Sequence, residues 1–284
     1  MCGIVGLHLR DPELHPCLGR LLTSMLAGVA ERGPDSAGVA VYGDRRRCPE
    51  GYAAVSLLDA PPDLPVPGAL VTEAGDTTVV AAPLPVEELL AAVTGARVVG
   101  AGTEVTIYKG TGRPLDLART YDLADARGWQ GLAHTRMATE SQVTAEGCHP
   151  FSVGPDQCLV HNGSFANHAS IRRELVAAGV AFDSENDSEV GARFVAARLA
   201  AGEDLDKALR ALCERFDGFY TLLVTSADGF AVVRDAIACK PAVIAETPRW
   251  VAMASEFRAL AELPGIDDAR IWEPEPERVY AWQW

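Results

Sequence analysis

No stretch of eighteen consecutive apolar residues occurs in the sequence, and no basic region followed by an apolar one stands at its amino end. Neither a membrane-spanning helix nor a secretion signal is therefore predicted. The seven cysteines form no CxxC pair, and their odd number leaves a free thiol under any disulfide scheme, which indicates a reducing compartment. We expect a cytoplasmic protein.

Positive charge is also scarce. Lysine and arginine number 25 against 39 aspartates and glutamates, which gives a formal net charge of −14. An acidic chain of this kind is repelled by nucleic acid and by anionic membrane surfaces, so neither is expected as a partner.

Apolar residues are plentiful, and they suffice for a large core, since 48% of the 284 residues are hydrophobic. We predict a single domain over residues 1–284. Between residues 61 and 128, stretches rich in proline and glycine interrupt the apolar periodicity of the sequence. This segment is therefore predicted to be an inserted subdomain. It is either a docking surface or a surface decoration.

Apolar periodicity predicts the secondary structure of the chain. Helices are expected at residues 14–29, 86–93, 167–178, 187–200, 204–215 and 255–263. Strands are expected at residues 3–7, 36–42, 131–135, 158–161, 219–225, 230–234, 242–245 and 250–254. The strand at 36–42 is expected to lie beside the first strand, which would bring the turn at residues 32–35 close to residue 2.

Cys2 is the most informative residue of the chain. Removal of Met1 would leave its thiol beside its own α-amine, which titrates at about pH 8 in model peptides and can take the thiol proton directly or through one water. The two groups would form a nucleophile with its own general base. The alternative is that Cys2 simply begins a buried strand, since residues 3–7 are apolar.

Four short motifs stand apart from the apolar pattern, and two of them carry arginines. Arg32 and Gly33 belong to a Gly-Pro turn, in which the arginine can lie near the nucleophile and the glycine leaves room for a ligand. A salt-bridged turn is the alternative. Arg136 follows a strand and suits bidentate binding of a carboxylate, unless it is ordinary surface charge.

The other two motifs carry amide and carboxylate groups. Asn162 and Gly163 end a strand, and an asparagine amide beside a glycine N–H can hold an oxyanion, although Asn-Gly is also a common turn. Asp187 stands at the start of a helix, where it either caps the helix or accepts the ammonium group of a ligand. Together the four motifs suit a small zwitterionic amide.

In order and approximate spacing, these motifs resemble those of the class II glutamine amidotransferases, a branch of the N-terminal nucleophile hydrolases. The resemblance covers MCGIVG, RGPDSAG, HTRMAT, HPF, HNG and NDSE, continues weakly through DGFYTLLV, RDAIACKP and ASEFRAL, and leaves residues 61–128 outside it. Within the family the chain is most similar to stand-alone amidotransferase subunits of glutamate synthase-like and N-methylglutamate synthase-like complexes. The resemblance implies an α+β fold, a four-layer αββα sandwich.

The resemblance also implies a role for each candidate residue. Cys2 attacks the side-chain amide of L-glutamine to give a γ-glutamyl thioester, with its α-amine as base and then acid. Asn162 and Gly163 hold the oxyanion. Arg136 binds the α-carboxylate of glutamine and Asp187 binds its α-ammonium group. The pocket is shaped by Arg32, Gly33 and Thr139.

The resemblance implies no cofactor in this chain and an ammonia acceptor on another protein. That protein is expected to be a glutamate synthase-like subunit, for which a flavin-containing chain is one candidate, because the sequence as far as Trp284 shows no recognisable phosphosugar, nucleotide or flavin domain. Met137 stands where many of these enzymes carry an aromatic residue of the ammonia path, which leaves the coupling to an acceptor open.

Two other functions fit the same sequence. A non-catalytic glutamine-binding or partner-docking module would be favoured by a retained Met1, because the general base would then be missing. A hydrolase of another γ-glutamyl amide would keep the fold and change the substrate, although Arg136 together with Asp187 argues for glutamine.

Histidines and cysteines lie near one another in the sequence between residues 134 and 161. His134, His149 and His161 accompany Cys148 and Cys158, but their spacings match no zinc pattern, and histidines at strand ends commonly bond to the backbone. No metal site is therefore predicted.

Overall fold

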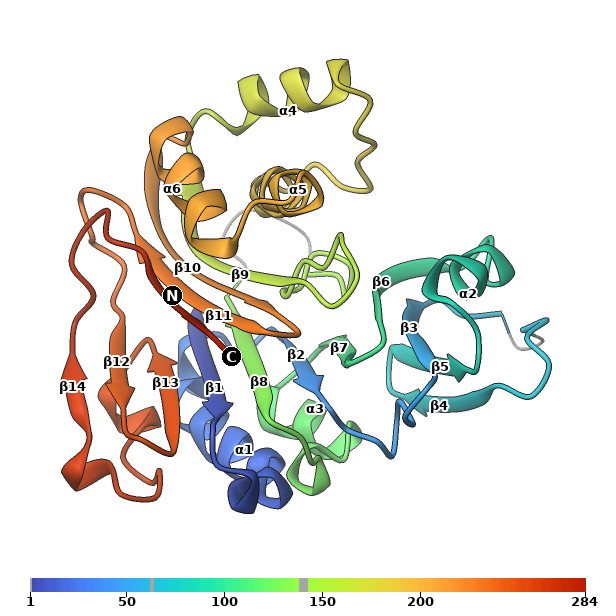
Figure 1. Ribbon diagram of the computed structural model, residues 1–284, viewed down its shortest axis with the longest axis horizontal. Helices are drawn as coiled ribbons and strands as arrows, with labels where there is room; N and C mark the ends of the chain where they lie inside the picture. The colour runs from blue at the N-terminus through green and yellow to red at the C-terminus, as the bar shows by residue number, and fades with distance from the viewer. Residues whose placement is uncertain (1, 62–63, 138–142) are drawn as a thin grey trace.

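The computed structural model describes residues 2–61, 64–137 and 143–284, and it consists of two facing β-sheets with helices on both outer sides (Figure 1). The larger sheet has the strand order β14 (Arg270–Trp272), β12 (Val243–Glu246), β13 (Trp250–Ala254), β1 (Gly3–Leu9), β8 (Gln130–Arg136), β2 (Ser36–Tyr42) and β7 (Val105–Thr111). The smaller sheet has the order β15 (Tyr280–Gln283), β11 (Gly229–Arg234), β10 (Gly218–Ser226) and β9 (Cys158–Phe165). Neighbouring strands in both sheets are antiparallel.

Apolar side chains from both sheets fill the space between them. Ile4 of β1, Val160 of β9 and Leu223 of β10 are all fully buried there. A Cβ at Gly6 would lie 2.3 Å from Leu223 Cδ2, so glycine at this position lets the two sheets approach each other. β1 is buried along both faces, which is why its sequence is a nearly continuous apolar run.

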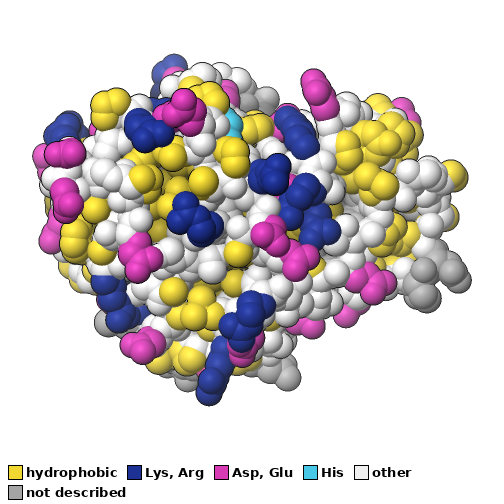
Figure 2. Space-filling model, turned by 90° about the horizontal axis from the view of Figure 1, so that it is seen from below, with side chains coloured by type: hydrophobic (Ala, Val, Ile, Leu, Met, Phe, Trp, Pro, Cys, Tyr) yellow, Lys and Arg dark blue, Asp and Glu magenta, His cyan; other side chains and the backbone are white. Residues whose placement is uncertain are grey.

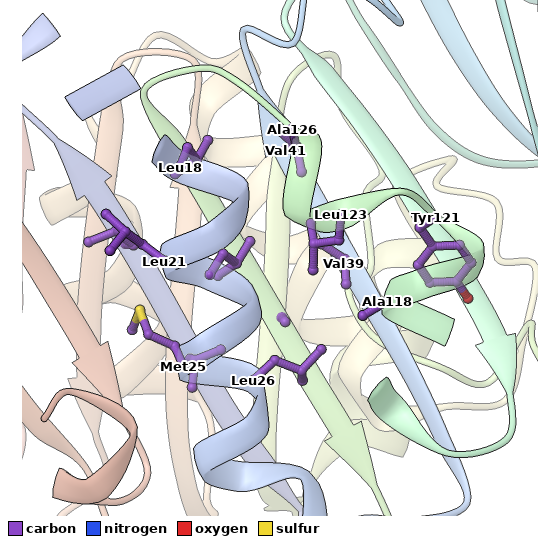
Figure 3. Packing of buried hydrophobic residues seen from close by; sticks show 14 of the residues in the cluster. Leu18, Leu21, Met25, Leu26, Val39, Val41, Ala118, Tyr121, Leu123 and Ala126 are labelled. Carbon is purple, nitrogen blue, oxygen red and sulfur yellow. The ribbon is translucent and has the colours of Figure 1, made fainter. Parts of the chain in front are cut away.

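The outer face of the larger sheet is covered by α1 (Leu18–Val29) and α3 (Pro114–Thr120). Figure 3 shows the apolar side of α1 lying on the sheet, and Leu18, Leu26 and Val39 of β2 belong to one buried cluster. All three side chains are fully buried. The helical spacing of the leucines in the sequence therefore places one continuous stripe against the core.

The outer face of the smaller sheet is covered by α4 (His168–Ala177), α5 (Asp187–Ala200) and α6 (Leu205–Arg215). Leu209 of α6 is fully buried in one cluster with Leu222 of β10. Helices, sheet, sheet and helices thus form four layers. The predicted α+β fold, an αββα sandwich, is confirmed.

A third sheet projects from the sandwich at the right of Figure 1. Its strand order is β4 (Leu70–Ala74), β5 (Thr77–Ala82), β3 (Ala53–Leu58) and β6 (Arg97–Gly102), and α2 (Val86–Ala92) packs on it to form a small core. These bounds differ from those of the predicted insert at 61–128. β3 precedes the proline-rich segment, whereas β7 and α3 follow the third sheet and belong to the main sandwich.

Two local predictions are wrong. β2 does not lie beside β1, because β8 from much later in the chain lies between them and pairs with both. β1 and β2 run parallel to each other, so an antiparallel strand between them completes both ladders. Residues 255–263 do not form a helix but only the 3₁₀ turn η4 (Phe257–Ala259), which packs closely on α1, since a Cβ at Gly28 would lie 2.5 Å from Ala259 Cα.

The surface carries charges of both signs. Acidic and basic side chains are interspersed on the face shown in Figure 2, and apolar side chains gather on the lobe formed by the third sheet. Within the three described ranges, no helix combines the length and the apolar content needed to cross a bilayer.

Candidate active site

Cys2 lies at one end of the space between the two sheets. In the pairing of β1 with β8, Ile4 is opposite His134, so both side chains point to the inner face of the sheet. Cys2, two residues before Ile4, continues this alternation. From the facing sheet, Asn162 of β9 contacts Cys2. The predicted nucleophile is therefore approached by residues of both sheets.

Two hydrogen bonds hold the main chain of Cys2. Its carbonyl oxygen accepts one from Arg32 Nε at 3.0 Å and one from Asn162 Nδ2 at 3.1 Å. Arg32 belongs to η2 (Ala30–Arg32), and its Nη1 lies 2.5 Å from Glu256 Oε1 in an ion pair in which the arginine side chain is only 10% exposed. Arg32 therefore positions the backbone of the nucleophile, and it is not among the residues that line the cavity around the thiol.

His134 lies beside the thiol of Cys2. Its Nε2 is 3.0 Å from Asn162 Oδ1. Because Asn162 Nδ2 donates to the carbonyl of Cys2, Oδ1 is the acceptor and His134 Nε2 carries a hydrogen. Burial by itself would raise the pKa of the Cys2 thiol, but the hydrogen bond and charge of His134, together with a backbone hydrogen bond from Met137, lower that pKa to about 7.

The thiol opens into a cavity of about 950 Å³ that Arg136 and Asp187 also line. Arg136 is the last residue of β8, and its Nη1 donates to Gly147 O at 3.1 Å. Asp187 is the first residue of α5, and its Oδ2 accepts the N–H of Phe165 at 2.8 Å. A thiol, a guanidinium group and a carboxylate thus share one cavity.

The start of α5 shows whether Asp187 caps the helix or is available to bind a ligand. The capping residue is Asn186, whose side chain accepts the N–H of Ser188 at 2.9 Å. Asp187 occupies the next position, in the first turn of the helix. The carboxylate of Asp187 is therefore not needed as a cap, and it faces the cavity.

Gly163 occupies a backbone conformation that only glycine fits. Its φ is 138°, and a Cβ there would lie 1.9 Å from Phe219 O. Its strand partner Tyr220 bonds through both its N–H and its carbonyl oxygen to Asp235 on the other side of β10. The Tyr220–Gly163 pair is thus of the non-hydrogen-bonded type, which turns the Gly163 N–H away from β10.

Asn162 links several parts of the site. Its Nδ2 donates to Cys2 O at 3.1 Å and to Ser255 Oγ at 3.4 Å, and Ser255 Oγ also accepts the N–H of Ile4 at 2.9 Å. Both hydrogens of Nδ2 therefore have protein acceptors in this structure. The role of Asn162 as an oxyanion donor stays a prediction.

Three further residues have particular placements. A Cβ at Gly33 would lie 2.5 Å from Arg136 N and 2.5 Å from Thr135 C, so the glycine lets its turn pack on β8 and is not among the residues that line the cavity. Met137 lines the cavity and is 39% exposed. Thr139 lies outside the described residues.

A second polar cluster lies at the cavity wall. His149 Nε2 and His161 Nδ1 are 3.0 Å and 2.9 Å from Ser188 Oγ. Burial lowers the pKa of His161 to about 4 and that of His149 well below its ordinary value, so both rings are neutral. In the part of the chain that the structure describes, no three histidine, cysteine or acidic side chains are arranged to hold a metal ion.

Sequence reasoning missed three contacts of the site. The pairing of β1 with β8 places His134 beside Cys2, but that pairing joins segments about 130 residues apart. Ser255 and Glu256 hold Asn162 and Arg32. Their only signal in the sequence is the weak resemblance of the segment ASEFRAL.

Comparison with known proteins assigns this arrangement to a family. A family model described as a glutamine amidotransferase domain matches residues 134–262. The glutamine amidotransferase-like protein GlxB of Rhizobium meliloti (strain 1021) is 48% identical over 298 residues, which cover 99% of this chain and 98% of that protein. The chain belongs to the class II glutamine amidotransferases.

Some other glutamine amidotransferases that this chain matches are longer. The amidophosphoribosyltransferase of Methanocaldococcus jannaschii is 31% identical over 165 residues, which cover 57% of this chain and 35% of that enzyme. The structure of glutamine phosphoribosylpyrophosphate amidotransferase from B. subtilis, complexed with ADP and GMP, has a TM-score of 0.64 at 18% identity. This chain covers 49% of that enzyme, and a likeness at this identity shows the fold alone.

Proposed function

We propose that this amidotransferase hydrolyses the side-chain amide of L-glutamine to glutamate and ammonia through a thioester on Cys2. The observation that carries the proposal is a single cavity lined by the thiol of Cys2, the guanidinium of Arg136 and the carboxylate of Asp187. Glutamine offers an α-carboxylate and an α-ammonium group for the two charges and an amide for the nucleophile. Amides that lack either charge would leave a site charge unpaired, so the site selects against them.

In the proposed reaction, removal of Met1 gives Cys2 a free α-amine that serves as a proton carrier. Sulfur forms a bond to the amide carbon, and the oxyanion that results is held by the N–H of Gly163 and by Asn162 Nδ2, donors worth about 2.7–4 kcal/mol where one has been deleted in another enzyme. The C–N bond then breaks and the nitrogen leaves with an added proton as ammonia. Water hydrolyses the γ-glutamyl thioester and releases glutamate.

We further propose that a separate synthase subunit of the glutamate synthase-like kind receives the ammonia. GlxB is matched over 98% of its length, whereas the amidophosphoribosyltransferase is matched over 35%. A relative without additional sequence for an acceptor site supports an arrangement in which another chain binds the acceptor.

A glutaminase assay tests the hydrolysis. Protein whose loss of Met1 has been verified by intact-mass spectrometry is expected to release glutamate and ammonia from L-glutamine, and Cys2→Ser is the matched control. N-acetylglutamine, which lacks the ammonium group, is expected to react at least tenfold more slowly. Glutamine binding without turnover in the processed protein would favour a non-catalytic module, and equal turnover of N-acetylglutamine would indicate another amide substrate.

Isotope transfer tests the partner. The complex is purified from the native cell and supplied with glutamine carrying ¹⁵N in its amide group. The label is expected in an organic product of the complex, even when unlabelled ammonium is present in excess. Label that equilibrates with that ammonium before incorporation would contradict direct delivery.

A further inference from the structure

The two ring nitrogens of His134 have different surroundings. The side chain is 1% exposed, and Nε2 lies 3.0 Å from Asn162 Oδ1. Nδ1 is fully buried, and within the described ranges no side-chain or backbone atom forms a standard hydrogen bond with it. Cys2 and His134 line the same cavity, and because Asn162 occupies Nε2, Nδ1 is the ring nitrogen left available to the thiol.

The hydrogen-bond pattern fixes the tautomer of this ring. Asn162 Nδ2 can only donate to the carbonyl oxygen of Cys2, so Asn162 Oδ1 must accept from His134 Nε2. A neutral imidazole with its hydrogen on Nε2 carries a lone pair on Nδ1. Within the described residues, no other group uses this acceptor, which borders the cavity that also contains the thiol.

We propose that His134 is a second catalytic base of this site, which takes the thiol proton of Cys2 before glutamine binds. The S–H bond breaks as the Nδ1–H bond forms, and the electron pair stays on sulfur. The resting site then holds a thiolate beside an imidazolium whose Nε2–H is bonded to Asn162 Oδ1. The use of this thiolate against an amide rests on the proposed function, whereas the ion pair itself requires no substrate.

The surroundings support the ion pair. A buried thiolate and a buried imidazolium are each unfavourable alone, but each would supply the opposite charge that stabilises the other. The thiol pKa of about 7 agrees with this arrangement. Several other charged or titratable groups surround the pair. They include the N-terminal amine, Arg32 of η2, Arg136 of β8, Glu146, His149, His161 of β9, His168 of α4, Glu185, Asp187 of α5 and Glu256.

The two bases would divide the proton transfers. The proton stored on His134 Nδ1 passes to the nitrogen of the leaving amide, so that ammonia departs and the imidazole is neutral again. The α-amine of Cys2 then accepts a proton from the water whose oxygen bonds to the thioester carbon, the C–S bond breaks to release the thiolate, and the α-ammonium group returns its proton to His134 Nδ1. Each step conserves its protons without an additional reactant.

Alkylation of Cys2 tests the proposal without turnover. The rate of modification of Cys2 by iodoacetamide is measured against pH by peptide mass spectrometry, in wild type and in His134→Gln. Glutamine keeps a donor for Asn162 Oδ1 but has no basic nitrogen. The midpoint of the profile is expected to move from about 7 in the wild type towards about 8.5, the ordinary thiol value, which slows alkylation at pH 7 roughly fifteenfold.

The control is His168→Gln, because His168 lines the same cavity but does not contribute to the acidity of the thiol. Its midpoint is expected to equal that of the wild type. All proteins are compared after mass spectrometry has shown the same state of Met1, since the α-ammonium group also affects the thiol. A midpoint of His134→Gln within 0.3 units of the wild type, at about the same rate, would overturn the proposal.

A measurement on the wild type covers the case in which His134→Gln does not fold. In ¹⁵N-histidine NMR spectra, one ring is expected to be an imidazolium at pH 8 in wild type and to become neutral in Cys2→Ser. An imidazole that is neutral in both proteins would contradict the ion pair. If the ion pair is present but the wild type hydrolyses no glutamine, the proposed function fails and this inference stands.

Discussion

Cys2 and Cys158 both face the space between the two sheets, yet their thiols differ greatly in acidity. Burial raises the pKa of Cys158 to about 12, whereas the pKa of Cys2 is lowered to about 7. Cys158 lies among Ile4, Val160 and Leu223, all fully buried. Cys2 lies at the open end of the same space, against His134. Burial acts in the same direction on both thiols, so the neighbouring imidazole and the cavity distinguish a nucleophile from an inert core residue.

The largest expected effect is on glutaminase turnover, which should depend on Cys2 but not on Cys158. Cys2→Ala is expected to lower glutaminase turnover at least about a thousandfold while the protein stays folded, because no other thiol lines the cavity. Turnover is measured by glutamate release and folding by circular dichroism. Cys158→Ala serves as the comparison and is expected to retain activity. Turnover of Cys2→Ala within tenfold of wild type would remove Cys2 as the nucleophile.

The next effect concerns a charged residue at the cavity that Cys2, but not Cys158, lines. Asp187→Asn is expected to raise the KM for glutamine roughly 10- to 100-fold, because the ammonium group of the substrate loses its carboxylate partner. Glu185→Gln is the matched control: its carboxylate also borders the cavity, but its side chain is 93% exposed and paired with Arg172. Steady-state kinetics measure both variants. Equal KM values for Asp187→Asn and wild type would exclude Asp187 from the substrate site.

A buried histidine on β9 gives a stability effect of intermediate size. The pKa of His161 is about 4 in the folded protein and about 6.5 when unfolded, so the unfolded state binds more protons between these values. The stability that the buried, neutral His161 ring contributes is present above pH 6.5, and it is lost as the pH falls towards 4. At pH 5 the loss is about 2 kcal/mol. Urea unfolding at pH 7 and pH 5 measures it, and His161→Gln is expected to show a smaller difference between the two pH values.

The smallest expected effect is on the free energy of unfolding, and it is seen by comparing two cysteines outside the cavity. Cys158→Ala is expected to cost about 1 kcal/mol of unfolding free energy, because it removes a buried sulfur, whereas Cys239→Ala at an exposed position stays within about 0.5 kcal/mol of wild type. Chemical denaturation measures both. A larger cost at Cys239 than at Cys158 would contradict the described packing of β9.

Local patterns in the sequence predicted the elements well where one face or both faces are apolar. The strand at residues 36–42 and the helix at residues 187–200 have the predicted bounds. The position of β2 relative to β1 could not be predicted, because it depends on β8, a strand about a hundred residues later. The bounds of the third sheet were obscured because β3 has the same apolar composition as the main strands.

The candidate site was accessible to sequence reasoning only in part. Cys2, Arg136 and Asp187 stand in motifs, and the structure places all three at one cavity. The contacts of His134 and Ser255 could not be predicted in the same way, because they depend on the register of strands that are distant in the sequence. The close packing of Gly33 on the backbone of β8 could not be predicted for the same reason.

The carbonyl oxygen of Cys2 receives one donor from a turn attached to the larger sheet and one from a strand of the smaller sheet. Any sliding of one sheet past the other would have to break one of these bonds and release the chain that carries the sulfur. The position of the Cys2 sulfur is therefore tied to the packing of the two sheets against each other.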